Sequence, residues 1–286
     1  DNFHSLSGLV FREDEVVLTP ERTGIQQLDT IPPPDRASLR CRIKGNQWVT
    51  WPQHIHSSRG CPYDCIFCAA KQLSGKVRYH SVERVVEEIE AIYTQYHQTH
   101  INFSDDLFTL KRSRIKELAE SIAASGIHRH VSFTVCARTS NLDEEMLSWM
   151  RQMNVQKIAC GFESGSERIL PYLKGHRMKV EDNQKAIDLC HRFGIEILGN
   201  FILGSSPETK QDLADTYWFV RKNQEKLKGV YFCHATPLPK TPWWPEALQR
   251  GLFSSETVQY DTLMVRYTPG ISYFMNHHYS ESFYEK

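Results

Sequence analysis

The segment HIHSSRGCPYDCIFC, residues 54–68, places a short strand-like stretch directly before Cys61, Cys65 and Cys68. The proline at position 62 and the lack of periodicity predict an irregular loop around these thiols. Three thiolates can each bind one iron of a cubane cluster and leave the fourth iron open. A zinc ion with His54 or His56 as fourth ligand is the alternative that the spacing leaves open. The segment therefore predicts a metal site that follows a strand.

Outward from this loop, short apolar runs alternate with amphipathic helical patterns. The runs predict strands over 54–58, 101–104, 131–136, 155–161, 195–203 and 230–234. Ser81 is placed to cap the first helix, Gly126 and Gly194 to end two later ones, and Pro207 to lie in the first turn of the last one. Six β/α repeats predict an α/β fold with a parallel sheet, closed in part into a (β/α)6 TIM-like barrel. In such barrels the chemistry collects at the carboxyl ends of the strands.

The two ends of the chain differ from this repeating middle. Residues 1–50 contain two hairpin-like pieces, over 9–18 and 42–49, and are expected to form an extended arm or linker packed on the barrel. Residues 51–236 form the barrel core, and residues 237–286 form a C-terminal extension with a short helix near 245–250. The isolated Cys136, Cys160 and Cys233 are expected to be small core residues, as is His234. The adjacent tryptophans at 243 and 244 are expected to pack rather than line a pocket.

Composition narrows the class of protein. The chain has 34 Lys and Arg against 34 Asp and Glu, with no long basic run, so no nucleic-acid partner is expected. No apolar run reaches the ~18 residues that a membrane span needs, so no membrane partner is expected. The start lacks a signal peptide, which together with the sparse cysteines predicts a reducing, cytoplasmic setting. The chain begins with Asp1 rather than Met and is expected to be processed, trimmed or part of a longer protein.

The cysteine loop, with Phe67 before its last cysteine, resembles the radical S-adenosylmethionine (SAM) superfamily. Further runs are similar, in the same order, to the subgroup related to cobalamin-dependent radical SAM enzymes, and these lie at 103–109, 137–143, 161–166, 201–209 and 236–241. Residues 28–35 resemble the linker that joins a cobalamin domain to the barrel. The resemblance covers nearly the whole chain.

The resemblance implies that Cys61, Cys65 and Cys68 hold a 4Fe–4S cluster whose open iron binds SAM. Roles are then implied for the residues that follow the strands. Phe67 would pack near the adenine. Ser104, Asp105 and Asp106 take the place of a Gly-Gly-Glu-like turn that binds the SAM amine, and Glu163 would bind the ribose or the amine. Arg138 would pair with the SAM carboxylate, and Asn200 would contact the adenine or the ribose. From the residues alone, either aspartate would serve equally as a helix cap, and Arg138 as a surface residue.

The resemblance also implies the reaction. A reductant such as flavodoxin or ferredoxin would supply one electron, and SAM would yield a 5′-deoxyadenosyl radical that takes hydrogen from a small-molecule or peptide substrate. The first hypothesis is cobalamin-assisted methyl transfer to an unactivated carbon, with cobalamin held by a domain outside this chain because no D-x-H-x-x-G motif occurs. The second is cobalamin-free cyclisation, rearrangement or oxidation. A tRNA methylthiotransferase would need further cluster cysteines and an RNA-binding appendage. A zinc-stabilised binding module is the non-enzymatic alternative.

Overall fold

A six-stranded parallel sheet forms the centre of the computed structural model, which describes residues 3–37, 41–42, 48–49, 53–254, 256–260, 263 and 273–279. The strands, in chain order, are β5 (His54–Ile55), β8 (His100–Phe103), β9 (Ser132–Ala137), β10 (Val155–Glu163), β11 (Glu196–Leu203) and β12 (Leu227–His234). Their order across the sheet is β12-β11-β10-β9-β8-β5, and every neighbouring pair is parallel. The expected α/β class and partial (β/α)6 architecture are confirmed, with β5 and β12 at the two edges of an open sheet.

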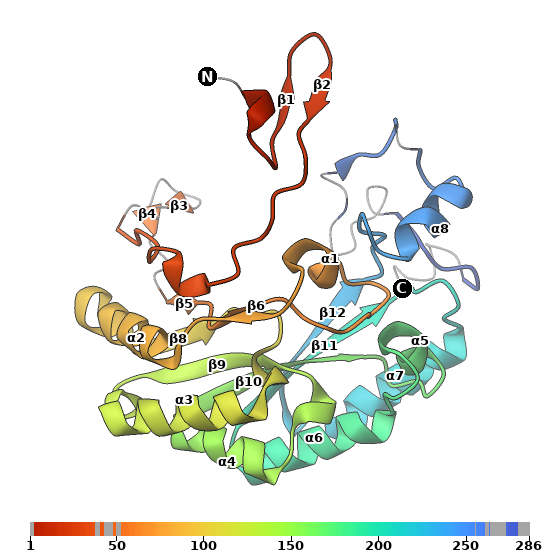
Figure 1. Ribbon diagram of the computed structural model, residues 1–286. Helices are drawn as coiled ribbons and strands as arrows, with labels where there is room; N and C mark the ends of the chain where they lie inside the picture. Colours follow the sequence, from red (N-terminus) through yellow and green to blue (C-terminus); the bar gives the residue numbers. More distant parts are fainter. Residues whose placement is uncertain are drawn as a thin grey trace.

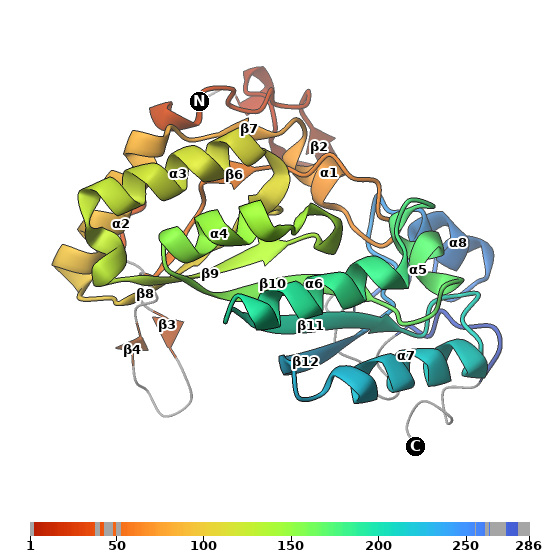
Figure 2. The same ribbon diagram turned by 90° about the horizontal axis from the view of Figure 1, so that it is seen from below.

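One face of the sheet is covered by a row of helices (Figures 1 and 2). These are α2 (Val82–Tyr96), α3 (Arg112–Ser125), α4 (Glu144–Gln152), α6 (Val180–Arg192) and α7 (Lys210–Asn223). Ser81 caps α2 by accepting a hydrogen bond from the Arg84 backbone N–H, and Gly126 ends α3 in the left-handed conformation. The expectation for Pro207 is wrong. Because Thr209 and Asp212 form a capping box, α7 starts at residue 210, and the proline precedes the cap.

The first strand is shorter than predicted. Only His54 and Ile55 join the large sheet, and the chain then turns so that β6 (Ser58–Arg59) pairs antiparallel with β7 (Arg78–Tyr79). The hydroxyls of Ser57 and Ser58, at the turn, donate to the carboxylate of Asp105, which follows β8. These hydrogen bonds hold the chain where it turns away from the sheet. Two short helices, α1 (Ala70–Ser74) and α5 (Ile169–Lys174), were also not predicted, since each is too brief to show a helical period.

Two separate hydrophobic clusters stabilise the molecule. The main core lies between the sheet and the row of helices and includes Phe133, Phe162 and Phe201. The second cluster lies at the carboxyl ends of the strands, where Trp243 and Met275 pack with part of the cysteine loop. Of the cysteines expected in the core, Cys160 is fully buried, Cys233 is half-buried and Cys136 is exposed. The expectation for Cys136 is wrong because its side chain lies on the sheet face opposite the helices.

The N-terminal arm contains both predicted hairpins. β1 (Val10–Arg12) pairs antiparallel with β2 (Val16–Leu18), and β3 (Cys41–Arg42) with β4 (Trp48–Val49). The first hairpin projects from the body (Figure 1). The short 3-10 helix Leu28–Thr30 instead packs against the start of α2, where Leu28 is buried and Asp29 accepts hydrogen bonds from the Ser81 backbone. The arm is therefore attached to the barrel around residues 28–36.

The C-terminal segment docks on the loop that follows β11. It begins with α8 (Trp243–Gln249), which confirms the short helix predicted there. Residues 273–279 return to the barrel, where Asn276 Nδ2 donates to the backbone oxygens of Ser205 and Glu208 at 2.8 and 2.7 Å. The Tyr279 hydroxyl donates to the buried Glu208 carboxylate at 2.8 Å. None of the helices among the described residues has the length and apolar character to cross a bilayer.

Glu208 gives the docked segment a pH dependence that can be measured. Burial raises its pKa to about 7, although hydrogen bonds from the Gly204 N–H and the Tyr279 hydroxyl oppose the shift. A carboxyl whose folded-state pKa is raised contributes stability below the unfolded pKa, and this contribution is lost as pH rises through about 7. In Glu208→Gln the side-chain oxygen still accepts hydrogen bonds but carries no charge. We expect the free energy of unfolding of this variant to be about 1–3 kcal/mol higher than that of the unsubstituted chain at pH 8, and not higher at pH 5.

Urea denaturation at intervals from pH 5 to pH 8 checks this expectation. The exposed Glu225 provides a matched control, because Glu225→Gln removes the same charge from a solvated position. Parallel pH profiles for the unsubstituted chain and Glu208→Gln would show that the buried carboxyl does not titrate with folding.

Candidate functional site

The cysteine loop lies between β6 and α1 and has no regular structure over residues 61–68. Its three thiols are half-buried. The backbone is held by a hydrogen bond from the Cys68 N–H to the Cys65 oxygen at 3.0 Å, and the Ala70 N–H donates to Cys68 Sγ at 3.4 Å. Burial raises the pKa of Cys61 and Cys68, and the other thiols of the loop add to the shift. The loop thus gathers three interacting thiols in one place, as its spacing predicts.

The arrangement of donors differs from that of a single-ion site. No three His, Cys, Asp or Glu side chains in the described ranges are arranged to hold one metal ion. His54, a candidate zinc ligand, has Nδ1 2.9 Å from the Ser104 hydroxyl. A cubane takes one thiolate on each of its irons and does not need the sulfurs to converge on a common point. The donor set therefore fits a cluster better than zinc.

A cavity of about 460 Å³ opens beside the loop, at the carboxyl ends of the strands. This volume lies within the ~300–1,000 Å³ typical of small-molecule sites. The loop contributes Phe67 and Cys68 to its lining, β8 is followed by Asp106, and β10 ends in Glu163. The C-terminal side is formed by Ile202, Cys233, His234, Thr236, Leu238 and Trp243. Trp243 thus both packs in the second cluster and lines the cavity, and His234 Nε2 lies 2.8 Å from the Tyr273 oxygen.

The three polar residues after β8 have different surroundings. Ser104 bonds to His54, and Asp105 is buried, accepting hydrogen bonds from Ser57 N at 2.7 Å and from the Ser57 and Ser58 hydroxyls at 2.6 Å each. Asp106 is exposed at the cavity and accepts from Gly60 N at 2.7 Å. The serines at 57 and 58, which sequence reasoning missed, surround both oxygens of the Asp105 carboxylate. Asp106 alone of the three lines the cavity.

Glu163 ends β10 in an unusual backbone conformation. Its φ is 62°, in the left-handed region that non-glycine residues rarely occupy, and the pairing register with β11 shifts between Gly161 and Glu163. The carboxylate folds back over Gly161, where a Cβ atom would meet Glu163 Oε1 at 2.1 Å. Such strained backbone concentrates at functional sites. The bulge re-aims the last side chain of the strand at the cavity.

A buried lysine holds the Glu163 carboxylate. Lys174 Nζ lies 3.3 Å from Glu163 Oε1 and donates to the Gly161 oxygen at 2.5 Å, and both side chains of the pair are buried. Burial raises the pKa of Glu163, while the charges of Lys174 and Arg138 act in the opposite direction. Sequence reasoning missed Lys174, because it ends a helix that showed no period.

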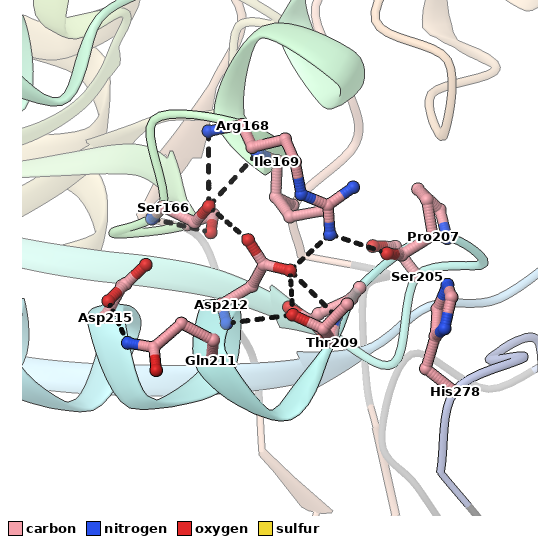
Figure 3. Close-up of polar contacts among 12 residues, drawn as sticks. Ser166, Arg168, Ile169, Ser205, Pro207, Thr209, Gln211, Asp212, Asp215 and His278 are labelled. Atoms are coloured by element: carbon pink, nitrogen blue, oxygen red, sulfur yellow. Dashed lines mark hydrogen bonds and ion pairs between the residues drawn. The ribbon is translucent and has the colours of Figure 1, made fainter.

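The loop that follows Glu163 is fastened to α7. Figure 3 shows Ser166, Arg168 and Thr209 directed at the Asp212 carboxylate, which accepts from the Ser166 and Thr209 hydroxyls at 2.6 Å each. Burial opposes ionisation of Asp212, but these hydrogen bonds and that of Arg168 lower its pKa to about 2. Gly165 lies so close to α7 that a Cβ atom would meet the Thr216 Cα at 2.7 Å. This packing fixes the position from which Glu163 faces the cavity.

Two predicted residues lie away from the cavity lining. Asn200 sits in the middle of β11, paired with Gly161 and Tyr231, on the face opposite the buried Phe201. Arg138 follows β9 and is buried, with its guanidinium 4.1 Å from the centre of the Tyr63 ring. It also donates to Cys65 Sγ at 3.6 Å and to the Lys174 oxygen at 3.1 Å. Tyr63, two residues after the first cysteine, was not singled out from the sequence.

Comparison with known proteins agrees with this geometry. The profile of the radical SAM superfamily matches residues 55–220. An uncharacterized methyltransferase of Pyrococcus horikoshii is 32% identical over 247 residues, which are 86% of this chain and 52% of that protein. An anaerobic magnesium-protoporphyrin IX monomethyl ester cyclase of Cereibacter sphaeroides is 26% identical, over 86% of this chain and 41% of the cyclase.

Among solved structures, the radical SAM methyltransferase TsrM from Kitasatospora setae, with cobalamin and a [4Fe–4S] cluster bound, superposes with a TM-score of 0.71. It is 18% identical, and the match covers 96% of this chain and 57% of that one. This likeness shows the shared fold. The chain spans about half the length of the curated relatives it matches.

Proposed function

The chain belongs to the radical SAM superfamily, and on this premise we propose that it holds a 4Fe–4S cluster on Cys61, Cys65 and Cys68 and cleaves SAM reductively. The observation that carries the proposal is the position of these half-buried thiols beside a cavity at the carboxyl ends of the strands. When bound, the cluster and SAM supply one-electron cleavage of a carbon–sulfur bond, a chemistry that no side chain provides.

The residues of the cavity have separable parts in binding SAM. Phe67 lines the wall beside Trp243, with ring centres 6.2 Å apart, and offers an apolar surface to the adenine. Asp106 accepts its hydrogen bonds from Gly60 and Ser74 on Oδ2, so Oδ1 is the oxygen that would receive the SAM amine. Glu163, oriented by its lysine partner, would accept from the ribose hydroxyls or the amine. Ser104 and Asp105 would act through the fold, and Asn200 is too far down its strand for us to assign it a contact.

For the reaction we propose cobalamin-assisted methyl transfer. Support comes from the methyltransferase names among the relatives, including one at 32% identity. Cobalamin would be held by a domain outside these 286 residues, and a flavodoxin or ferredoxin would deliver the electron. The cyclase name among the relatives favours a second candidate, cyclisation on the same barrel. The second hypothesis takes this cyclisation to proceed without cobalamin. The substrate-facing wall, formed by Thr236, Leu238 and Trp243, would differ between these reactions while the cluster loop stays the same.

Anaerobic reconstitution with iron and sulfide tests the cluster. We expect about four irons per chain, and a loss of iron in each of Cys61→Ala, Cys65→Ala and Cys68→Ala, because a cubane with one thiolate removed is no longer held. Cys136→Ala is the matched control, since this cysteine is exposed on the sheet and lies outside the loop. One zinc per chain with no iron would instead support the zinc-stabilised binding module.

Asp106 is tested by SAM affinity. We expect Asp106→Asn to weaken SAM binding to the reconstituted chain about tenfold or more. A neutral amide binds the charged amine more weakly than a carboxylate does, while its oxygen can still accept the hydrogen bond from Gly60. Anaerobic equilibrium dialysis measures the affinity, and the iron content must stay unchanged. Asp64→Asn is the control, as this carboxylate is exposed on the same loop and pairs with Lys71. If Asp106→Asn and the unsubstituted chain bind SAM with equal affinity, Asp106 only accepts hydrogen bonds within the protein and does not bind SAM.

The products separate the two reactions. Methyl transfer to an unactivated carbon uses two SAM molecules: the methyl donor leaves S-adenosylhomocysteine, and the one cleaved reductively leaves methionine and 5′-deoxyadenosine. Cyclisation without methyl transfer leaves no S-adenosylhomocysteine. We expect the natural full-length protein, supplied with cobalamin and a reductant, to form S-adenosylhomocysteine, and to stop forming it when cobalamin is omitted. Chromatography of the products measures both. Formation of 5′-deoxyadenosine alone, unchanged by cobalamin, would favour the cyclisation reading over methyl transfer.

A further inference from the structure

We propose that Arg138 sets the reduction potential of the cluster by fixing a positive charge against the sulfur of Cys65. The inference rests on the proposed function, because it requires that Cys65 is a cluster ligand. It differs from the role that the resemblance implies, in which the same guanidinium pairs with the SAM carboxylate.

The guanidinium is held from three sides. Nη1 donates to Cys65 Sγ at 3.6 Å, Nη2 donates to the Lys174 backbone oxygen at 3.1 Å, and Cζ lies over the Tyr63 ring, 4.1 Å from its centre. The side chain is only 7% exposed. A planar cation stacked on an aromatic ring and bonded at two nitrogens has little freedom to turn toward a different partner.

Arg138 forms no direct ion pair with a carboxylate in the described part of the chain, although its charge acts on Glu163. The arginines that form ion pairs there lie elsewhere, at 36, 112, 168, 192 and 250. The nearby Glu163 is already paired with Lys174. A buried charge without a partner is costly. The thiolate form of Cys65 is therefore the anion that this buried cation is placed to meet.

Such an arrangement acts on the cluster's redox balance. Reduction adds one negative charge to the cluster, and a fixed cation at its sulfur stabilises the reduced form more than the oxidised one. Net charge and hydrogen bonds to the sulfurs are established determinants of cluster potentials. Arg138 should therefore make the cluster easier to reduce.

The position of Arg138 distinguishes this role from SAM binding. It is not among the residues that line the cavity, whereas Glu163 and Asp106 are. The sulfur it contacts comes from the middle cysteine of the loop, and only Cys68 of the three lines the cavity. Its substitution should change the potential more than the affinity for SAM.

The test is a redox titration of the reconstituted chain, followed by electron paramagnetic resonance without SAM. Arg138→Met removes the charge and keeps much of the length, and we expect a more negative midpoint. The ratio of reduced to oxidised cluster at a fixed solution potential should fall at least tenfold, which for one electron corresponds to about 59 mV. Arg138→Lys keeps the positive charge but loses the paired N–H donors of the guanidinium. Its midpoint potential should lie between those of the unsubstituted chain and Arg138→Met. Arg59→Met, at an exposed position, is the matched control.

The outcomes are separable from those of the proposed function. An unsubstituted chain that binds no iron defeats the proposed function itself. The inference is overturned if Arg138→Met retains four irons and its midpoint potential is unchanged. It is also overturned if this variant loses affinity for SAM while its midpoint potential stays the same. If Arg138→Met does not retain its irons, Tyr63→Leu supplies the test, because it releases the guanidinium from the ring. A more negative midpoint in that variant supports the role of Arg138, and an unchanged one refutes it.

Discussion

The buried carboxylate of Asp105 ties the cysteine loop to the sheet. The first strand contributes only His54 and Ile55 to the sheet, so backbone pairing alone gives the following loop a weak anchor. Asp105 compensates by binding the backbone and hydroxyl of Ser57 and the hydroxyl of Ser58. Hydrogen bonds to a charged acceptor are stronger than neutral ones. Together with the β6–β7 pairing and the hydrogen bond from Gly60 to Asp106, this side chain sets the direction in which the chain enters the loop.

On the Glu163 side of the cavity, charged side chains are likewise held by contacts with segments that are distant in the sequence. Glu163 is turned toward the cavity by a bulge and braced by Lys174, and the loop beyond it is fastened to α7 through Asp212. The backbone oxygen of Lys174 also receives Arg138. One short helix, α5, therefore positions an anion for the cavity and a cation for the cysteine loop. Glu163 is paired with the Lys174 ammonium, and Arg138 is held by the Lys174 backbone oxygen, so Glu163 and Arg138 are positioned by separate contacts.

Much of the fold could be predicted from the sequence because its signals are local. Apolar runs, Ser81 as a cap and Gly126 as a stop each depend on neighbours a few residues away, and six repeats specify a parallel sheet. The cysteine spacing is equally local. The missed features are contacts between distant residues, such as Arg138 with a sulfur 73 positions earlier. The resemblance implied SAM contacts for Arg138 and Asn200, and neither residue lines the cavity. The sequence does not reveal how high on the barrel the cavity begins.

The division of the interior into two hydrophobic clusters has a consequence for how such a protein diverges. The main core supports the sheet and the helices, whereas the second cluster, around Trp243, Phe253 and Met275, supports the cavity wall and the part of the cysteine loop that packs on it. Substitutions in groups that share no contacts have nearly additive effects on stability. The wall could therefore be remodelled over generations while the sheet and its helices keep their stability. A lineage built this way can acquire new substrates without reinventing its radical chemistry.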